Sequence, residues 1–130
     1  MWDNKIVGHA DIDPESLLAH AGNFRIHPSN QQKALEGSIG KLGFIRSVTV
    51  SQRTGTVIDG HLRVILALRN QEPTIPVEYV DLTEQEENEA LLLLDPISAM
   101  AVTDKEKMEE LFALVMGDDC LLYTSDAADE

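Results

Sequence analysis

The stretch Val57-Ile58-Asp59-Gly60-His61-Leu62-Arg63 decides how the fold is interpreted. Its first residues continue Thr56 as a short β-branched strand, and Gly60 interrupts that strand. Apolar residues at helical spacing follow at once, so the stretch predicts a strand-to-helix turn. The expected apolar face of this helix is Val64, Ile65, Ala67 and Leu68.

Further strands surround this turn. Alternating β-branched residues at 47–51 predict a strand, and Arg53-Thr54-Gly55 predicts a tight turn. The strand before Gly60 therefore returns as the second arm of a hairpin. A third strand is expected at 76–80, where Pro76 opens a β-branched run. Together these elements predict a small mixed sheet.

Helices are expected before and after the sheet. Asp13-Pro14-Glu15 is typical of a helix start, and Gly22 would end that helix early. Ser29 or Asn30 would cap the next helix, which Gly43 stops. Its expected inward face is Ala34, Leu35, Ile39 and Leu42. The chain is therefore predicted to be a compact α+β domain.

Two further helices are expected after the third strand. Thr83-Glu84-Gln85-Glu86 is a capping box, and its helix would run to Asp95-Pro96. The last helix would begin at Thr103. Its expected inward face is Met108, Leu111, Phe112 and Val115.

Composition narrows the class of protein. The chain has 130 residues, 43% of them hydrophobic and 25% charged, which is typical of one globular domain. Its apolar runs, such as that at 90–94, are far shorter than the roughly 20 residues that cross a bilayer. No signal sequence is recognised at the N-terminus, and the single Cys120 predicts no disulfide framework. A cytoplasmic location without membrane contact is expected.

The net charge of −13 is unevenly distributed along the chain. Residues 23–71 contain seven basic and two acidic residues, whereas the remainder contains three basic and 21 acidic residues. This pattern favours a local phosphate site in the basic middle of the chain over an extended DNA-binding face.

The turn at Asp59–Arg63 carries the first candidate site. A helix N-terminus attracts anions, and Gly60 lets the backbone approach a ligand closely. The guanidinium of Arg63 would grip phosphate oxygens or a carboxylate. His61 could donate a hydrogen bond or act as a catalytic acid or base, and Asp59 could orient His61 or hold a metal. Alternatively, Asp59 is a helix cap, His61 a surface residue and Arg63 a salt-bridge partner.

The second candidate site is Asn23-x-Arg25-x-His27. In an extended segment these three side chains share one face, which is too polar for a core. They are therefore candidate ligand-binding residues, and an exposed edge strand is the alternative. A zinc site from His27, His61 and a carboxylate has no ligand pair at metal-site spacing, so no metal is predicted.

The C-terminal end differs from the rest of the chain. Helical periodicity stops at Gly117, and the string from Cys120 to Glu130 resembles translated sequencing-adapter DNA on unrelated predicted proteins. A genuine acidic, disordered tail is the alternative. The expected organisation is a domain at 1–102, a helix at 103–117 leading to a missing region, and a non-native or disordered tail at 118–130.

Taken together, five segments resemble the ParB/sulfiredoxin superfamily in its ParB-like N-terminal domain form. They are Asn23–Pro28, Leu42–Phe44, Val48–Val50, Val57–Arg63 and Ile75–Val77. The resemblance covers roughly residues 10–100. It implies that the turn after the hairpin binds nucleotide phosphate through Gly60, His61 and Arg63. It also implies that Asn23, Arg25 and His27 lie beside that ligand.

Departures from the family refine this expectation. Sulfiredoxins have a catalytic cysteine where this chain has His61, so cysteine-sulfinate reduction is not expected. Chromosome-partitioning ParB proteins have Gly-Glu-Arg-Arg where this chain has Gly60-His61-Leu62-Arg63. Domains of mobile elements and phages, often fused to DNA methyltransferases, are more similar because they have a Gly-His-x-Arg turn. A missing C-terminal domain would then contact DNA.

The resemblance implies a nucleotide-binding domain of a DNA-associated protein, with a nucleoside triphosphate and Mg²⁺ as expected ligands. One alternative is a nucleotide-dependent phosphotransferase of small molecules, with His61 or Asp59 as the base. A second is a ParB-like nuclease, although Asp59 is the only carboxylate expected near the site. A third is an adaptor that docks a partner through its acidic residues at 84–89.

Overall fold

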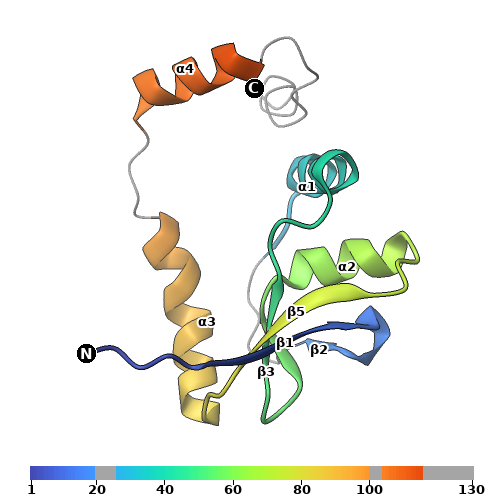
Figure 1. The fold of residues 1–130 in the computed structure, drawn as a ribbon, viewed down its shortest axis with the longest axis vertical. Helices are drawn as coiled ribbons and strands as arrows, with labels where there is room; N and C mark the ends of the chain where they lie inside the picture. Colours follow the sequence, from blue (N-terminus) through green and yellow to red (C-terminus); the bar gives the residue numbers. More distant parts are fainter. Residues whose placement is uncertain (20–25, 100–103, 116–130) are drawn as a thin grey trace.

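The computed structural model describes residues 1–19, 26–99 and 104–115. It confirms the predicted α+β class, with a mixed sheet and flanking helices (Figure 1). The strands are β1 (Ile6–Ile12), β2 (Leu18–Ala19), β3 (Val48–Ser51), β4 (Thr56–Asp59) and β5 (Ile75–Val80). The helices are α1 (Ser29–Leu42), α2 (His61–Arg69), α3 (Glu84–Ala99) and α4 (Lys105–Val115), and a 3₁₀ turn spans Pro14–Ser16.

The five strands lie in the order β1-β5-β3-β4-β2. β3 and β4 form the predicted antiparallel hairpin, in which Thr49 pairs with Asp59. β5 runs parallel to β3 and antiparallel to β1, while β2 runs parallel to β4. Because β3 and β4 lie inside the sheet, the turn after β4 starts from a strand that is held on both sides.

A small aliphatic core joins the sheet to α2. Its buried members are Val48, Val50, Val57, Val64, Ala67, Ile75 and Val77. α2 packs against β3 and the 3₁₀ turn, and α1 packs against α2. In Figure 1, α1 lies above α2, whereas α3 runs along the other flank of the sheet and contacts β4. α2 is thus fixed between the sheet and α1.

In the N-terminal segment one expectation was wrong and one strand was missed. The predicted helix at Asp13 is only the three-residue 3₁₀ turn, although Asp13 does cap it by accepting from the N–H of Glu15 at 2.9 Å. β1 was not predicted, because Gly8 and Ala10 are too small to make the alternation of its half-buried positions visible. The chain therefore gains an edge strand where no sequence signal was read.

The inward faces of α1 and α2 were only partly predicted. Leu42 is 61% exposed, and Ser29 is the first residue of α1, not its cap. Ile65 and Leu68 are exposed, whereas Leu62 and Leu66 are buried instead. α2 has neighbours on two sides, so its buried positions do not form the single stripe that one interface would produce.

The C-terminal helices also differ from expectation. α3 continues to Ala99 and does not end at Asp95-Pro96. α4 begins at Lys105, after Asp104 accepts a hydrogen bond from the N–H of Lys107 at 3.1 Å. Of its expected inward residues, Met108, Leu111 and Val115 are exposed and Phe112 is half-buried. Among the described residues, α4 therefore has no interface that would bury its apolar face.

Candidate functional site

The turn between β4 and α2 has the predicted geometry. β4 ends at Asp59, and Gly60 has φ 100° and ψ 22°, in the left-handed region. The first helical hydrogen bond runs from the N–H of Val64 to the carbonyl of Gly60 at 3.1 Å. The N–H groups of a helix's first turn have no acceptor within the helix, and the helix dipole makes that end partly positive. The turn is therefore suited to an anion.

Gly60 is required for conformation and for space. A Cβ atom at this position would lie 2.9 Å from Nη2 of Arg63 and 3.3 Å from Cα of Val48. The second contact is with strand backbone, which cannot move aside as a flexible side chain would. Gly60 therefore lets the helix N-terminus lie directly against β3.

Two arginines flank one carboxylate at the turn. Nη2 of Arg63 donates to the carbonyl of Ser47 at 3.3 Å and lies 3.9 Å from Oδ2 of Asp59. Nη2 of Arg46 lies 3.9 Å from the same oxygen. The side chain of Arg63 is only 13% exposed, whereas that of Arg46 is 71% exposed. Arg63 is thus held in place, and Arg46 is free to reorient toward a ligand.

These residues line one cavity of about 360 Å³. Ligand pockets usually hold about 300–1,000 Å³, so this one suits a small ligand. Its wall comprises His27, Gln31, Leu35, Arg46, Asp59, Gly60, His61, Leu62, Arg63 and Leu94. Five of the residues predicted from the sequence are therefore brought together in one place. Two others, Asn23 and Arg25, lie outside the described residues.

The alternative interpretations of the turn are corrected in two respects. His61 is not a surface residue, because it is buried and lines the cavity. Asp59 is not a helix cap: within the described structure, Gly60 is the N-cap of α2 and no side chain caps this end. Arg63 does approach Asp59 as an ion-pair partner, although the 3.9 Å separation is longer than a hydrogen bond.

His27 enters the cavity from the segment before α1. Its Nδ1 is 3.0 Å from Oε1 of Gln31, one helical turn further on. Its backbone carbonyl accepts from the side-chain amide of Gln32 at 2.8 Å. Nε2 of His27 is buried and has no hydrogen-bond partner among the described residues. The ring is therefore held through Nδ1 by Gln31.

Half of the residues that line the cavity were not predicted from the sequence as site residues. Arg46 belongs to the basic span, but it lies in the link between α1 and β3, where its direction was not predictable. Gln31 could have been found, because it follows His27 by four residues at the start of a helix. Leu94 comes from α3, and only the tertiary structure brings that helix to the turn.

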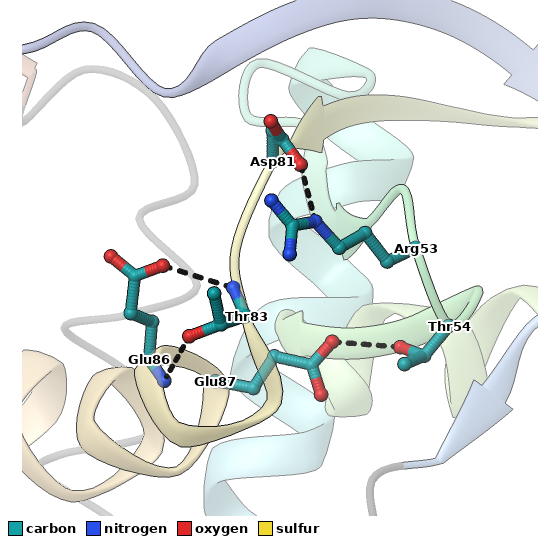
Figure 2. A network of polar contacts seen from close by, with 6 residues as sticks. All are labelled: Arg53, Thr54, Asp81, Thr83, Glu86 and Glu87. Carbon is teal, nitrogen blue, oxygen red and sulfur yellow. Dashed lines mark hydrogen bonds and ion pairs between the residues drawn. The ribbon is translucent and has the colours of Figure 1, made fainter.

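A polar network fixes the start of α3 to the β3–β4 turn (Figure 2). Thr83 and Glu86 form the predicted capping box, with reciprocal hydrogen bonds of 2.9 and 3.2 Å. Hydrogen bonding of the Glu86 carboxylate to the backbone N–H of Thr83, and also to its side chain, lowers the pKa of Glu86. The hydroxyl of Thr54 donates to Oε1 of Glu87 at 2.8 Å, and Glu87 is only 2% exposed. The beginning of the helix that supplies Leu94 is thus tied to the hairpin.

An ion pair supports the same junction from the other side. Nε of Arg53 donates to Oδ1 of Asp81 at 2.7 Å (Figure 2). This hydrogen bond lowers the pKa of Asp81 and raises that of Arg53. Asp81 lies between β5 and α3, so the pair links the hairpin turn to the segment that leads into the helix.

Metal-binding and membrane-spanning features were also searched for. Within residues 1–19, 26–99 and 104–115, no group of three or more His, Cys, Asp or Glu side chains is arranged to hold a metal ion. His27, His61 and Asp59 line the same cavity without forming such a group. None of the helices in that part of the chain is long and apolar enough to cross a membrane.

Two solved structures have a fold similar to that of this chain. A C-terminally truncated chromosome-partitioning protein ParB from Caulobacter crescentus, complexed with CTP-γ-S, matches with a TM-score of 0.70 and 17% identity. The match covers 85% of this chain and 63% of that one. The chain has a ParB-like fold. A Pnob8-like ParB-N domain matches with a TM-score of 0.56 and 19% identity, over 68% of this chain and 36% of that one.

The resemblance to ParB-like N-terminal domains is thus confirmed at the level of the fold. This chain spans less than two thirds of the length of either ParB-like neighbour. No protein-family model matches the sequence, and no curated protein matches it. The ParB-like fold is a finding, whereas the ligand and activity of this chain are inferred from its own residues.

Proposed function

We propose that this chain is a nucleotide-binding domain of a cytoplasmic, DNA-associated protein from a phage, a plasmid or a DNA-modification system. One observation carries the proposal. A single cavity gathers the glycine turn, two arginines, His27 and His61 at the N-terminus of α2. The CTP-γ-S complex of the ParB protein with the same fold supports a nucleotide as the ligand.

Each residue of the turn has a role in this proposal. The N–H groups that follow Gly60 bind phosphate oxygens, and Arg63 neutralises their charge from its fixed position beside Ser47. Arg46 leaves Asp59 and reaches the same phosphates. His61 donates a hydrogen bond to them. Asn23 and Arg25, which lie outside the described residues, are proposed to contact the same ligand.

Mg²⁺ is the proposed counter-ion of the triphosphate. Asp59 is the only carboxylate among the described residues that line the cavity, and it is half-buried between two guanidinium groups. A single protein carboxylate is a common Mg²⁺ arrangement when the ligand supplies phosphate oxygens and waters complete the shell. Asp59 fits this role better than it fits that of a cap.

Titration calorimetry with Mg²⁺ and CTP, ATP, GTP or UTP tests the proposal. At least one nucleotide should bind saturably, and Arg63→Gln should weaken it about 10- to 100-fold, since a charge-assisted bond is lost. Arg69→Gln is the matched control, because Arg69 is an exposed arginine of the same helix that bonds Gln32 outside the cavity. No binding of any nucleotide, or equal losses in both variants, would refute the proposal.

A phosphotransferase is the second candidate function. The observation that favours it is the presence of His61 and Asp59 together in the cavity wall, where either could act as a base. The wild-type protein would then convert the bound nucleoside triphosphate to the diphosphate in the presence of an acceptor. Asp59→Asn would abolish this turnover, whereas a binding domain leaves the nucleotide intact over hours.

DNA association is proposed to depend on sequence beyond Gly117. This chain covers 63% and 36% of the two ParB-like neighbours, so each has further sequence that this chain does not match. The natural reading frame past this position is the direct test. A methyltransferase or helix-turn-helix domain encoded there would support the proposal, and a frame without any DNA-binding domain would contradict it.

A further inference from the structure

α1 is held less firmly than the other elements that line the candidate site. None of its residues is buried, and its main contact among the described elements is α2, which lies between it and the sheet (Figure 1). Two exposed side-chain hydrogen bonds join the helices, from Arg69 to Gln32 at 3.1 Å and from Asn70 to Glu36 at 2.9 Å. Few buried contacts and exposed hydrogen bonds mark the parts of a protein that move at low cost in free energy.

A second cavity, of about 280 Å³, lies between α1 and α2. It is lined by Glu36, Ile39, Gly40, Phe44, Leu66, Ala67, Asn70 and Glu72. Side chains that border an open space lack the dispersion contacts that close packing would give them. α1 is therefore not packed tightly against α2 on this side. None of the described residues lines both this cavity and that of the candidate site.

The two cavities lie on different flanks of α1. Gln31 and Leu35 are one helical turn apart and line the candidate site. Glu36 and Gly40 are also one turn apart and line the second cavity. At 3.6 residues per turn, the second pair is displaced from the first by about 140° around the helix axis. A shift of α1 toward one cavity therefore narrows that cavity and widens the other.

The C-terminal end of α1 provides a pivot for such a shift. Gly43 follows the helix with φ 80° and ψ −175°, which glycine adopts readily, and a Cβ there would meet nothing within 4 Å. The next residue, Phe44, packs against the hydrophobic core. Gln31 and Leu35 lie toward the other end of the helix. The anchored end thus follows a glycine joint, and the end that lines the candidate site is remote from it.

We propose that α1 is a lid over the candidate site, and that the second cavity is the space into which the lid withdraws when the site opens. Closing brings Gln31 and Leu35 onto the bound ligand, and opening narrows the second cavity. Element-terminal residues such as Gly43 absorb the backbone rotation in movements of this kind. The ligand of the closed state rests on the proposed nucleotide-binding function, and the inference goes beyond that function because it assigns a moving element to the site.

The distance between two spin labels measures the position of α1 directly. Lys33→Cys and Thr74→Cys place one label on the exposed surface of α1 and one just before β5, in a protein that also carries Cys120→Ser. We expect pulsed electron paramagnetic resonance to give a broad distance distribution without ligand. It should become narrower with Mg²⁺ and whichever of CTP, ATP, GTP or UTP binds. The matched control joins Gln52→Cys to Thr74→Cys, two exposed positions at the ends of β3 and β5, and should be narrow throughout.

Gly40→Leu tests the role of the second cavity. A Cβ at Gly40 would meet nothing within 4 Å, so a leucine there has room to fill the space between the helices. The ligand-free distance distribution should then become narrower. Release of a fluorescent nucleotide in stopped flow should slow about 3- to 10-fold, because withdrawal of α1 would expel part of a leucine side chain from its contacts. Lys41→Leu is the matched control, since Lys41 is exposed and lines neither cavity, and it should match the wild type.

The outcomes separate the lid from the nucleotide-binding function. A ligand-free distribution as narrow as that of the control pair would overturn the lid, even if Gly40→Leu does not fold. Saturable nucleotide binding that leaves the distribution unchanged would also overturn it, and nucleotide binding would stand. Equal behaviour of Gly40→Leu and Lys41→Leu would overturn the role of the second cavity. A broad ligand-free distribution that narrows in Gly40→Leu would support the lid, even if no nucleotide binds and the proposed function fails.

Discussion

Replacing Gly60 by alanine is the sharpest test of the turn. Gly60 has φ 100°, a conformation that residues with a Cβ rarely adopt. The new methyl group would also lie 3.2 Å from Cγ2 and 3.3 Å from Cα of Val48, a fully buried residue of β3. Strain and crowding therefore act in the same direction.

The expected loss of stability can be estimated from these two effects. A left-handed conformation costs an L-residue about 1–2 kcal/mol, and a forced methyl group in a packed site costs about 1–3 kcal/mol. Because the first contact, Nη2 of Arg63 at 2.9 Å, can shift, the smaller packing figure applies. We expect Gly60→Ala to lower the free energy of unfolding by about 2–3 kcal/mol, measured by urea denaturation.

Gly40→Ala provides a matched control of opposite sign. Gly40 lies inside α1, its backbone is not in the left-handed region, and a Cβ there meets nothing within 4 Å. Alanine should stabilise this position by about 0.5–1 kcal/mol, because glycine loses more entropy in a helix. If Gly60→Ala were as stable as the wild type while Gly40→Ala behaved as expected, the geometry assigned to the turn would be wrong.

Three other predictions concern the attachment of α3. Leu91→Ala should lower the free energy of unfolding by about 2–4 kcal/mol, because Leu91 is only 5% exposed. Leu92→Ala should have little effect, because Leu92 is 63% exposed. Equal losses in the two variants would contradict the orientation of the helix. Thr54→Val should destabilise the protein by about 1–2 kcal/mol in urea denaturation, because the buried carboxylate of Glu87 on α3 loses a hydrogen-bond donor. An unchanged denaturation midpoint would contradict this hydrogen bond. The pKa of Asp81 is lower in the folded protein than in the unfolded chain, because Arg53 stabilises its charged form. Its ion pair with Arg53 therefore stabilises the fold at pH values above the unfolded-state pKa of about 4. This contribution disappears as the pH falls through the lower folded-state pKa. The stabilities of wild type and Asp81→Asn should therefore converge in acid denaturation series below about pH 4, and parallel curves would refute the assignment.

The sequence predicted the elements whose signals are local. The hairpin, the glycine turn and the capping box at Thr83 depend on neighbouring residues, and the structure confirms all three. β1 was missed because its pairing with β5 joins residues about seventy positions apart, as the contact of His9 with Glu78 shows. Small residues in this edge strand gave no local pattern to detect.

In the candidate site, too, the sequence predicted the residues that are neighbours along the chain and missed those that only the tertiary structure brings together. Five consecutive residues, Asp59 to Arg63, come from the turn, so their proximity was fixed once the turn was identified. The wall also contains His27, Gln31 and Leu35 from around the start of α1 and Leu94 from α3. Helix packing alone decides whether such residues meet, and periodicity does not specify which helices become neighbours. The sequence therefore predicted the turn and its residues but not the outline of the cavity.

The β3–β4 hairpin contacts two of the elements that line the cavity, the strand-to-helix turn and α3. β4 delivers Gly60, while the tip of the same hairpin holds α3 through the hydroxyl of Thr54 and the buried carboxylate of Glu87 (Figure 2). Glu87, Leu91 and Leu94 follow one another at helical spacing on one face of α3. The hairpin that leads into Gly60 is thus also bonded to the helix that contributes Leu94 to the cavity wall.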